Sequence, residues 1–419
     1  MVKRSIAYGG LLLAAVYGLN IADRYICSLF MESIKSEYDM SDAMAGFVTG
    51  SASAILFAAS SIPFGYAADR FNAKRLIVVA LLTWSSFSIL SGLSRALPSF
   101  VIARMGLGFA EAAAGPASQV FVAERYAPRD RGLVLAILSI GAPVGAAFGN
   151  FVGGAIAAEL GWRSAMVAFG LLGFPLALLL LCNRQDRSGA DVGPREAGKG
   201  TYAELLRLIA TNPMLRHLVA GATVVSLWGW GLIWWTPSFL QRTFGYSLVE
   251  TGELLGILHL AGGIAGCVAA GLAAMFIRDG SAVTTAKYLL ISTVIGTLCS
   301  VVAYGADDAS LSRLALLPFF AASYFFVAPT AALCLVSVDA NLRGRLAAIV
   351  LLFSNLASLL VGPLAIGLAS DLVAQSGIGA MRSLQVVVLL WTATGAWAAA
   401  HFALAMRHSL RAAKHGSVC

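Results

Sequence analysis

Twelve long apolar segments dominate this 419-residue chain and restrict what it can fold into. A helix needs about 20 apolar residues to cross the hydrocarbon core of a membrane. Lipid offers no partner for unpaired backbone groups, so each segment must be a helix, and the length and continuity of the segments exclude strands. The predicted spans are 6–30, 43–67, 76–95, 99–122, 133–158, 164–182, 215–239, 250–276, 284–304, 312–336, 346–370 and 384–406.

The composition agrees with a chain whose solvent is lipid. Hydrophobic residues make up 59% of the chain and charged residues only 12%, whereas a soluble domain carries roughly 25% charged residues. The net charge of +8 does not indicate nucleic acid, because the basic residues lie in short segments between the apolar runs. No basic-aromatic stripe or long basic tail exists, so we expect no nucleic-acid partner.

The basic residues also predict an orientation. Twenty-one of the 29 Lys and Arg fall on the side of both termini, and Arg24 and Arg104 lie within spans. The other six, on the opposite side, are Lys35, Arg95, Arg163, Arg242, Arg313 and Arg382. Positive charge accumulates on the cytoplasmic side, so both termini are predicted to be cytoplasmic. The start of the chain is basic and then apolar like a signal peptide, but it lacks a clear cleavage site and reads as a retained first helix.

A polar segment from Asn183 to Asn212 divides the spans into six and six, and ends in an amphipathic stretch, 202–209. We therefore expect an all-α membrane protein with a six-helix bundle at 1–183, a cytoplasmic linker at 184–213 and a second bundle at 214–419. Two landmarks recur at nearly one offset: Pro116 and Pro329 are 213 residues apart, and Arg131 and Arg343 are 212 apart. Matching landmarks in matching helices indicate an internal duplication.

The loop after the second apolar run carries a charge pattern. Gly65 is followed by Asp69-Arg70 and then by Lys74-Arg75. With the six-plus-six division, this pattern resembles the major facilitator superfamily, which implies two pseudo-symmetric bundles and alternating access. The resemblance implies that Gly65, Asp69, Arg70 and Arg75 form a gate at the cytoplasmic helix ends; the alternative is a solvated loop that only sets orientation. The second copy is degraded, because Met275 stands where the acid would follow Gly271.

Further stretches resemble the Spinster-like branch of that superfamily, which implies proton-linked movement of lysolipids or sphingolipids. The organic-anion symporter branch shares the Asp-Arg pair of the first span and the helix-four stretch, so a sugar acid or aromatic acid substrate stays open. The Spinster-like stretches are Asn20-Ile21-Ala22-Asp23-Arg24, Glu32-Ser33-Ile34-Lys35, Ser41-Asp42, Trp235 to Arg242, Leu342-Arg343-Gly344-Arg345, Ser354-Asn355 and Gly362-Pro363. The helix-four stretch, Arg104 to Ala112 followed by Pro116, resembles a second signature of the superfamily as a whole.

Four charged residues lie clearly within predicted spans: Asp23, Arg24, Arg104 and Glu111. Charge inside a bilayer is costly and is kept mainly for pathways, relays or pairs. A carboxylate that moves between an apolar setting and an arginine can load and release a proton, so Asp23 and Glu111 are the predicted proton-coupling residues. Arg24 and Arg104 are predicted to bind an anionic substrate, because guanidinium suits phosphate and carboxylate. The alternative is a fixed ion pair between the first and fourth helices.

Other polar or aromatic residues within spans are weaker candidates. Asn20, Asn150, Asn355 and Trp235 are predicted substrate contacts. The alternative is a helix–helix hydrogen bond for each asparagine and an aromatic belt at the outer membrane interface for Trp235. His259 could sense protons, although a lone histidine in an apolar helix more often packs against its neighbours.

Motifs for other activities are absent from the sequence. We find no His-x-x-Glu-His, no Gly-x-Ser-x-Gly and no phosphate-binding Gly-x-x-x-x-Gly-Lys, which argues against an enzyme and a primary pump. The six cysteines lie far apart, so no metal or cofactor is expected. The sequence predicts a monomeric secondary transporter of the plasma or bacterial inner membrane, whose partners are a small-molecule substrate, protons and membrane lipid. A membrane sensor of the same fold is the alternative from another class.

Overall fold

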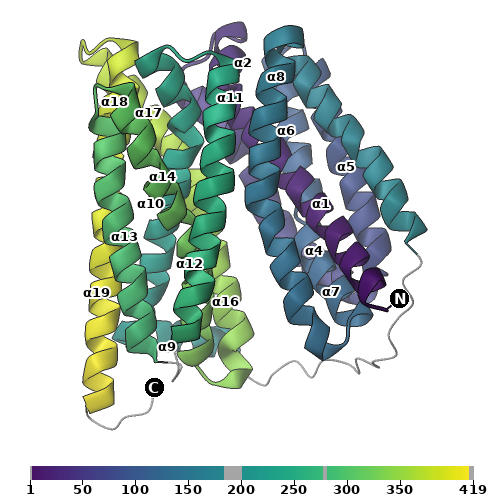
Figure 1. The fold of residues 1–419 in the computed structure, drawn as a ribbon, viewed down its shortest axis with the longest axis vertical. Coiled ribbons are helices and arrows are strands. Elements are labelled where there is room, and N and C mark those ends of the chain that lie inside the picture. The colour runs from purple at the N-terminus through teal and green to yellow at the C-terminus, as the bar shows by residue number, and fades with distance from the viewer. Residues whose placement is uncertain (1, 184–200, 277–280, 415–419) are drawn as a thin grey trace. The chain divides into compact units, whose positions relative to one another are not determined.

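The computed structural model describes residues 2–183, 201–276 and 281–414. Every regular element in these ranges is a helix, which confirms the predicted all-α class (Figure 1). The α-helices are α1 (Val2–Leu29), α2 (Met31–Glu37), α3 (Asp42–Gly46), α4 (Ala52–Arg70), α5 (Ala73–Leu93), α6 (Leu97–Glu111), α7 (Ala114–Arg125), α8 (Pro128–Cys182), α9 (Tyr202–Thr211), α10 (Pro213–Phe244), α11 (Leu248–Ile257), α12 (Gly263–Phe276), α13 (Ala282–Gly305), α14 (Ala309–Phe325), α15 (Val327–Val336), α16 (Ala340–Asn355), α17 (Gly362–Gln375), α18 (Ala380–Trp391) and α19 (Ala393–Lys414). Three π-helical segments, η1 (Phe47–Ser51), η2 (Leu258–Gly262) and η3 (Leu356–Val361), join neighbouring helices.

The helices account for all twelve predicted spans. Ten helical stretches of the described chain are long and apolar enough to cross a membrane. One of them, Arg129–Cys182, contains two predicted spans. The two are separated by a break in α8 at Gly161, where φ is +80°. A residue with a side chain rarely adopts that backbone conformation, so glycine suits the corner. The first predicted span, 6–30, is α1, whose apolar sequence is interrupted by Asp23 and Arg24.

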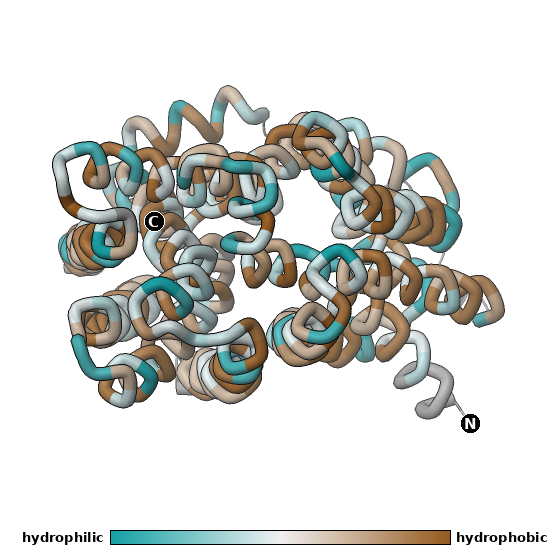
Figure 2. Tube along the Cα trace, turned by 90° about the horizontal axis from the view of Figure 1, so that it is seen from above, coloured by the Kyte–Doolittle hydropathy of each residue, from teal (hydrophilic) through white to brown (hydrophobic). Residues whose placement is uncertain are grey.

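Hydropathy follows this arrangement. Seen from above in Figure 2, hydrophobic segments run along the helices and hydrophilic segments gather where the chain turns. Many large apolar side chains are exposed on the helices, for example Leu178, Leu298 and Leu314. Such exposure is expected of a surface whose solvent is hydrocarbon.

The chain forms two compact units. Unit 1 comprises residues 1–195 and 237–260, and unit 2 comprises residues 196–236 and 261–419. The bundle boundaries expected from sequence, 1–183 and 214–419, stay a prediction. Part of the expected linker, 184–200, lies outside the described residues. Its amphipathic end is α9, which begins at a capping box formed by Thr201 and Glu204.

Structural details repeat between the two halves of the sequence, at offsets close to those of the sequence landmarks. The π-helical segment η1 begins at residue 47 and η2 begins at residue 258, 211 residues later. Arg131 Nε donates to the Tyr126 carbonyl at 3.1 Å, and Arg343 Nε donates to the Val338 carbonyl at 3.3 Å. Each arginine binds the carbonyl five residues before it, 212 residues apart. These matched features support the predicted duplication.

Glycines let the helices of unit 1 approach closely. A Cβ atom on Gly145 of α8 would overlap the backbone of Gly18 on α1. A Cβ atom on Gly252 of α11 would likewise collide with the Asn150 carbonyl of α8. Small residues at such crossings maximise van der Waals contact where the hydrophobic effect gives no help. The close packing brings the polar residues of α1, α6 and α8 into one bundle.

Candidate functional site

An ion pair inside unit 1 joins α1 to α6. Arg24 Nε donates to Glu111 Oε2 at 2.8 Å, and Arg24 Nη2 lies 2.6 Å from the same oxygen. The Arg24 guanidinium also lies 5.0 Å from the centroid of the Phe57 ring. Both bonds end on one carboxylate oxygen, and Glu111 Oε1 is buried without a hydrogen-bond partner in the described part of the chain.

Asp23 has a different partner. It is buried on α1, and Ser88 of α5 donates its hydroxyl to Asp23 Oδ1. The same hydroxyl lies 3.3 Å from the Met166 carbonyl of α8, so Ser88 links three helices. The second oxygen, Asp23 Oδ2, has no hydrogen-bond partner among the described residues. Sequence reasoning missed Ser88, because a serine in an apolar helix gives no signal of its own.

Arg104 is the least satisfied of the four charged residues. Its side chain lies on α6 in the bundle interior, with 1% of the residue exposed. Within the described ranges it forms no ion pair, and its Nε and Nη2 atoms lack hydrogen-bond partners. Asp23 and Glu111 lie within electrostatic reach. A buried guanidinium with free donors is unusual, because unpaired buried charge is costly.

Three further residues extend this polar group. Asn20 of α1 is buried and its Nδ2 has no described partner. Asn150 of α8 donates Nδ2 to the Ala146 carbonyl at 2.8 Å, while its Oδ1 has no described partner. His259, in η2, is buried against Tyr25, with the two ring centroids 4.5 Å apart in an edge-on arrangement. All three residues belong to unit 1, as do the four charged residues.

Two predicted contacts belong to unit 2. Trp235 of α10 is fully buried and donates Nε1 to the Pro363 carbonyl at 3.1 Å. This contact gives the tryptophan a packing role in unit 2, and it joins two stretches that carried the Spinster resemblance. Asn355 ends α16 immediately before the π-helical segment η3, and its carbonyl accepts from Ser358 at 3.3 Å.

The predicted gating residues lie at the end of α4 and the start of α5. Asp69, Arg70 and Arg75 are exposed, and none of them forms an ion pair within the described ranges. A side chain at Gly65 would meet no atom within 4 Å. Lys74, from the same pattern, donates to the carbonyls of Leu181 and Asn183 at 2.7 and 2.8 Å, so it caps the end of α8. The gating role stays a prediction.

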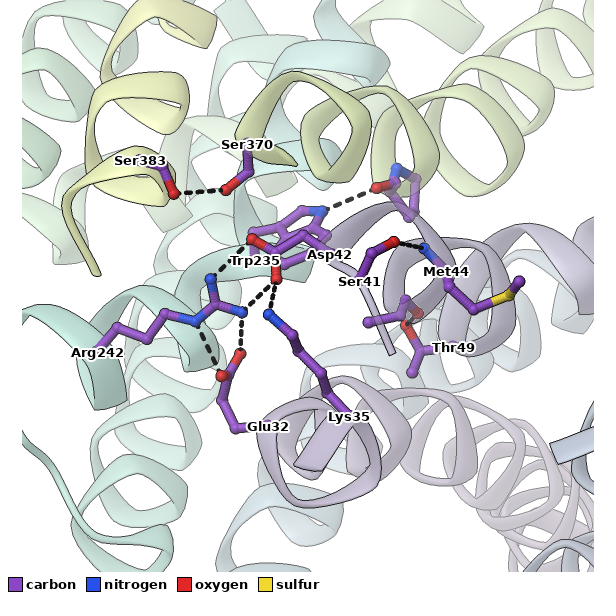
Figure 3. Close-up of polar contacts among 12 residues, drawn as sticks. Glu32, Lys35, Ser41, Asp42, Met44, Thr49, Trp235, Arg242, Ser370 and Ser383 are labelled. Atoms are coloured by element: carbon purple, nitrogen blue, oxygen red, sulfur yellow. Dashed lines mark hydrogen bonds and ion pairs between the residues drawn. The ribbon is translucent and has the colours of Figure 1, made fainter. Parts of the chain in front are cut away.

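A second charged cluster joins the end of α10 to α2 and α3 within unit 1 (Figure 3). Arg242 donates Nε and Nη2 to the two Glu32 oxygens, each at 2.8 Å. It also binds both oxygens of Asp42, from Nη1 at 2.8 Å and from Nη2 at 2.6 Å. Lys35 pairs with Asp42 as well. All four residues lie in stretches that resemble the Spinster-like branch, but sequence reasoning gave them no role.

Comparison with known proteins assigns the chain to a family. The model of the Major Facilitator Superfamily matches residues 13–363. A protein of Mycolicibacterium smegmatis described as an MFS-type efflux pump is 31% identical over 365 residues, which cover 86% of this chain and 83% of the relative. The probable galactarate/D-glucarate transporter GarP of Escherichia coli is 26% identical over 345 residues, covering 74% and 76% of the two chains.

Solved structures show the same fold. The crystal structure of a bacterial homolog of the human lysosomal transporter Spinster, inward-facing and unoccupied, superposes with a TM-score of 0.86. The alignment covers 98% of each chain at 21% sequence identity, a likeness that shows the fold. The chain therefore belongs to the Major Facilitator Superfamily, and it is an integral, multi-pass membrane transporter. The predicted family, its likeness to the Spinster-like branch and the predicted fold are confirmed.

Proposed function

We propose that this transporter works by alternating access, couples transport to protons, and moves an amphiphilic or anionic small molecule. The observation that carries the proposal is the environment of Arg104, a buried guanidinium with two nitrogens that have no described partner. Guanidinium binds phosphate and carboxylate groups through paired hydrogen bonds, so an anionic group of the substrate is the ligand that these donors suit best.

The charges around Arg104 supply a reason for proton coupling. Two arginines and two carboxylates are balanced in this part of unit 1, and Arg24 already compensates Glu111. An anion bound at Arg104 would add one negative charge to the set. A proton on Asp23 would restore the balance, and a neutral carboxyl group keeps its hydrogen bond to Ser88. Proton and anion would therefore each strengthen the binding of the other, as linkage requires.

The Spinster-like stretches favour a lysolipid or sphingolipid-like substrate, with an anionic headgroup at Arg104 and a hydrocarbon tail. The alternative is proton symport of a small organic anion such as a sugar acid or an aromatic acid. The likeness to GarP favours this alternative, because that relative is described as a probable galactarate/D-glucarate transporter. We further propose that both termini are cytoplasmic and that the protein acts as a monomer in the plasma or bacterial inner membrane.

A proteoliposome screen tests these proposals. Lysophospholipids, sugar acids and aromatic acids are each offered with and without a pH gradient. Transport of lysophospholipids that a pH gradient accelerates supports the main proposal, whereas a preference for sugar acids or aromatic acids selects the alternative. Counterflow separates a carrier from a sensor of the same fold, because a sensor exchanges no solute.

Variants of Arg104 test the site itself. Arg104→Gln removes the charge and should weaken substrate binding by about a hundredfold, since a hydrogen bond to a charged group contributes roughly 1.5–3 kcal/mol and the guanidinium makes more than one. Arg104→Lys keeps the positive charge but not the paired N–H donors of the guanidinium, so its loss of substrate affinity should be smaller. Unchanged half-saturation of transport in Arg104→Gln, in protein that melts like the wild type, would refute an anion site at Arg104.

A further inference from the structure

A groove lies between the end of α5 and the second half of α8, and none of the four charged residues that lie within spans lines it. Its volume is about 420 Å³, and its apolar wall includes Leu93, Val167 and Leu171. Arg95 and Arg163 also line it. The groove therefore combines two cations with a hydrocarbon surface, and all of these residues belong to unit 1.

Arg163 is fixed by its neighbours. Its Nε and Nη2 donate to the Ser94 carbonyl at 3.2 and 2.7 Å, and Nη2 also donates to the Tyr38 hydroxyl at 3.0 Å. Its Nη1 pairs with Glu37, and its guanidinium lies 4.3 Å from the ring centroid of Trp162. A guanidinium has five N–H donors, and these contacts use four of them. One N–H remains in a side chain that is already held in place.

Arg95 is exposed and forms no ion pair within the part of the chain that the structure describes. Glu37 balances the charge of Arg163, so Arg95 leaves the lining of the groove with a net charge of +1. One anionic group would neutralise it.

The groove lies beside the end of one predicted span and the start of another, where we expect a membrane interface. The span 73–93 ends at Leu93, two residues before Arg95, and α8 resumes after its break at Gly161, two residues before Arg163. Tyr38 and Trp162 stand beside the arginine, and aromatic side chains with a polar tip favour the headgroup level. Leu93 and Leu171 are 62% and 55% exposed, so the apolar wall is open to lipid tails.

We propose that this groove binds an anionic glycerophospholipid, with the phosphate at Arg95 and Arg163 and an acyl chain along Leu93, Val167 and Leu171. Basic pockets between transmembrane helices recognise lipid headgroups in this way. A zwitterionic headgroup carries its own cation and does not neutralise the extra charge, so the site favours a headgroup with net negative charge. This site is separate from Arg104 and does not depend on the proposed substrate.

Native mass spectrometry of the full-length protein tests the proposal. Phosphatidylglycerol and phosphatidylethanolamine with identical acyl chains are titrated separately, and inorganic phosphate is added as a competitor. The wild type should retain phosphatidylglycerol at lower concentration than phosphatidylethanolamine. Arg95→Gln should raise the concentration needed by about tenfold and remove the preference. Arg313→Gln, which alters another exposed arginine on the same predicted side, should change neither.

Leu171→Trp supplies an independent variant that fills the apolar wall. It should weaken the retention of both lipids, whereas a headgroup-only site would be unaffected. Three results would overturn the proposal: equal retention of the two lipids by the wild type, equal losses in Arg95→Gln and Arg313→Gln, or displacement of the lipid by inorganic phosphate at matched concentration. Thermal unfolding of each variant shows that the compared proteins are folded.

Discussion

Arg24 of α1 binds Glu111 of α6 through one oxygen only, with both its Nε and its Nη2 directed at Oε2. The pair therefore holds two helices together and leaves the second carboxylate oxygen without a described partner. Glu111 can keep its arginine while Oε1 meets a proton or a ligand. The interpretation as a fixed ion pair therefore applies to Glu111 Oε2, and the interpretation as a proton-coupling group applies to Glu111 Oε1.

Glu111→Gln is expected to lower the free energy of unfolding by about 3 kcal/mol, because it removes the charge that compensates a largely buried arginine. The amide oxygen can still accept from Arg24, so the loss should be at the low end for a broken buried pair. Thermal unfolding in detergent measures the change. Glu159→Gln, at an exposed position of α8, is the matched control and should melt like the wild type. Equal melting of the two variants would show that the Arg24–Glu111 pair does not stabilise the fold.

Asp23→Asn is expected to abolish the dependence of transport on a pH gradient while counterflow of the substrate persists. Asparagine resembles a protonated aspartate in shape and can still accept from Ser88, but it cannot release a proton. Glu111→Gln should lose the pH dependence as well. Proton-driven uptake in proteoliposomes measures both, with Asp307→Asn at an exposed position as control. If uptake by both variants still responds to the pH gradient, Asp23 and Glu111 are not the coupling residues.

Arg242→Gln is expected to destabilise the protein by about 3 kcal/mol or more, since it leaves Glu32 and the buried Asp42 with Lys35 as their only cation in the cluster. Arg242→Lys should lose about half as much, because an ammonium group cannot form the fork that binds both acids. Thermal unfolding compares the two with Arg382→Gln, which lies at an exposed position. If all three variants have the same melting temperature, the cluster does not contribute measurably to the stability of the fold.

Gly145→Ala is expected to cost about 2 kcal/mol, because the added methyl group would overlap the backbone of Gly18 and force α1 and α8 apart. Gly132→Ala, in the same helix, meets no atom within 4 Å and should be neutral or stabilising by up to about 1 kcal/mol through helix propensity. Chemical or thermal unfolding of the two variants checks the contrast. A reversed order would mean that the α1–α8 contact can relax to accept a side chain.

Sequence reasoning located the spans and the buried charges, but it did not identify how the charges pair. The cost of charge in lipid identifies Asp23, Arg24, Arg104 and Glu111 from composition alone. Which residues pair depends on how each helix is rotated about its own axis relative to its neighbours. Successive residues differ by about 100° around a helix, and a single sequence does not give the rotation of one helix against another. Asp23, for example, accepts a hydrogen bond from Ser88, a residue that no sequence pattern singled out.

The Arg242 cluster shows a second limit of sequence reasoning. Glu32 and Arg242 are 210 residues apart, and the sequence analysis counted Arg242 only among the basic residues that predict orientation. Their contact follows from the tertiary fold, which brings the end of α10 to α2. The resemblance to the Spinster-like branch had already singled out the three stretches that contain Glu32, Lys35, Asp42 and Arg242. That shared resemblance was the one indication in the sequence that these residues could be in contact.

The π-helical segments η1 and η2 give the two halves a tolerance of length at matching places. A π-helical turn accommodates one extra residue without altering the helix on either side. Deleting a single residue from 47–51 or from 258–262 should therefore leave a regular α-helical turn, whereas a deletion elsewhere in the same helix would rotate all that follows by about 100° and turn lipid-facing side chains into the bundle. Among related chains, single-residue insertions and deletions within helices should therefore be found at these turns.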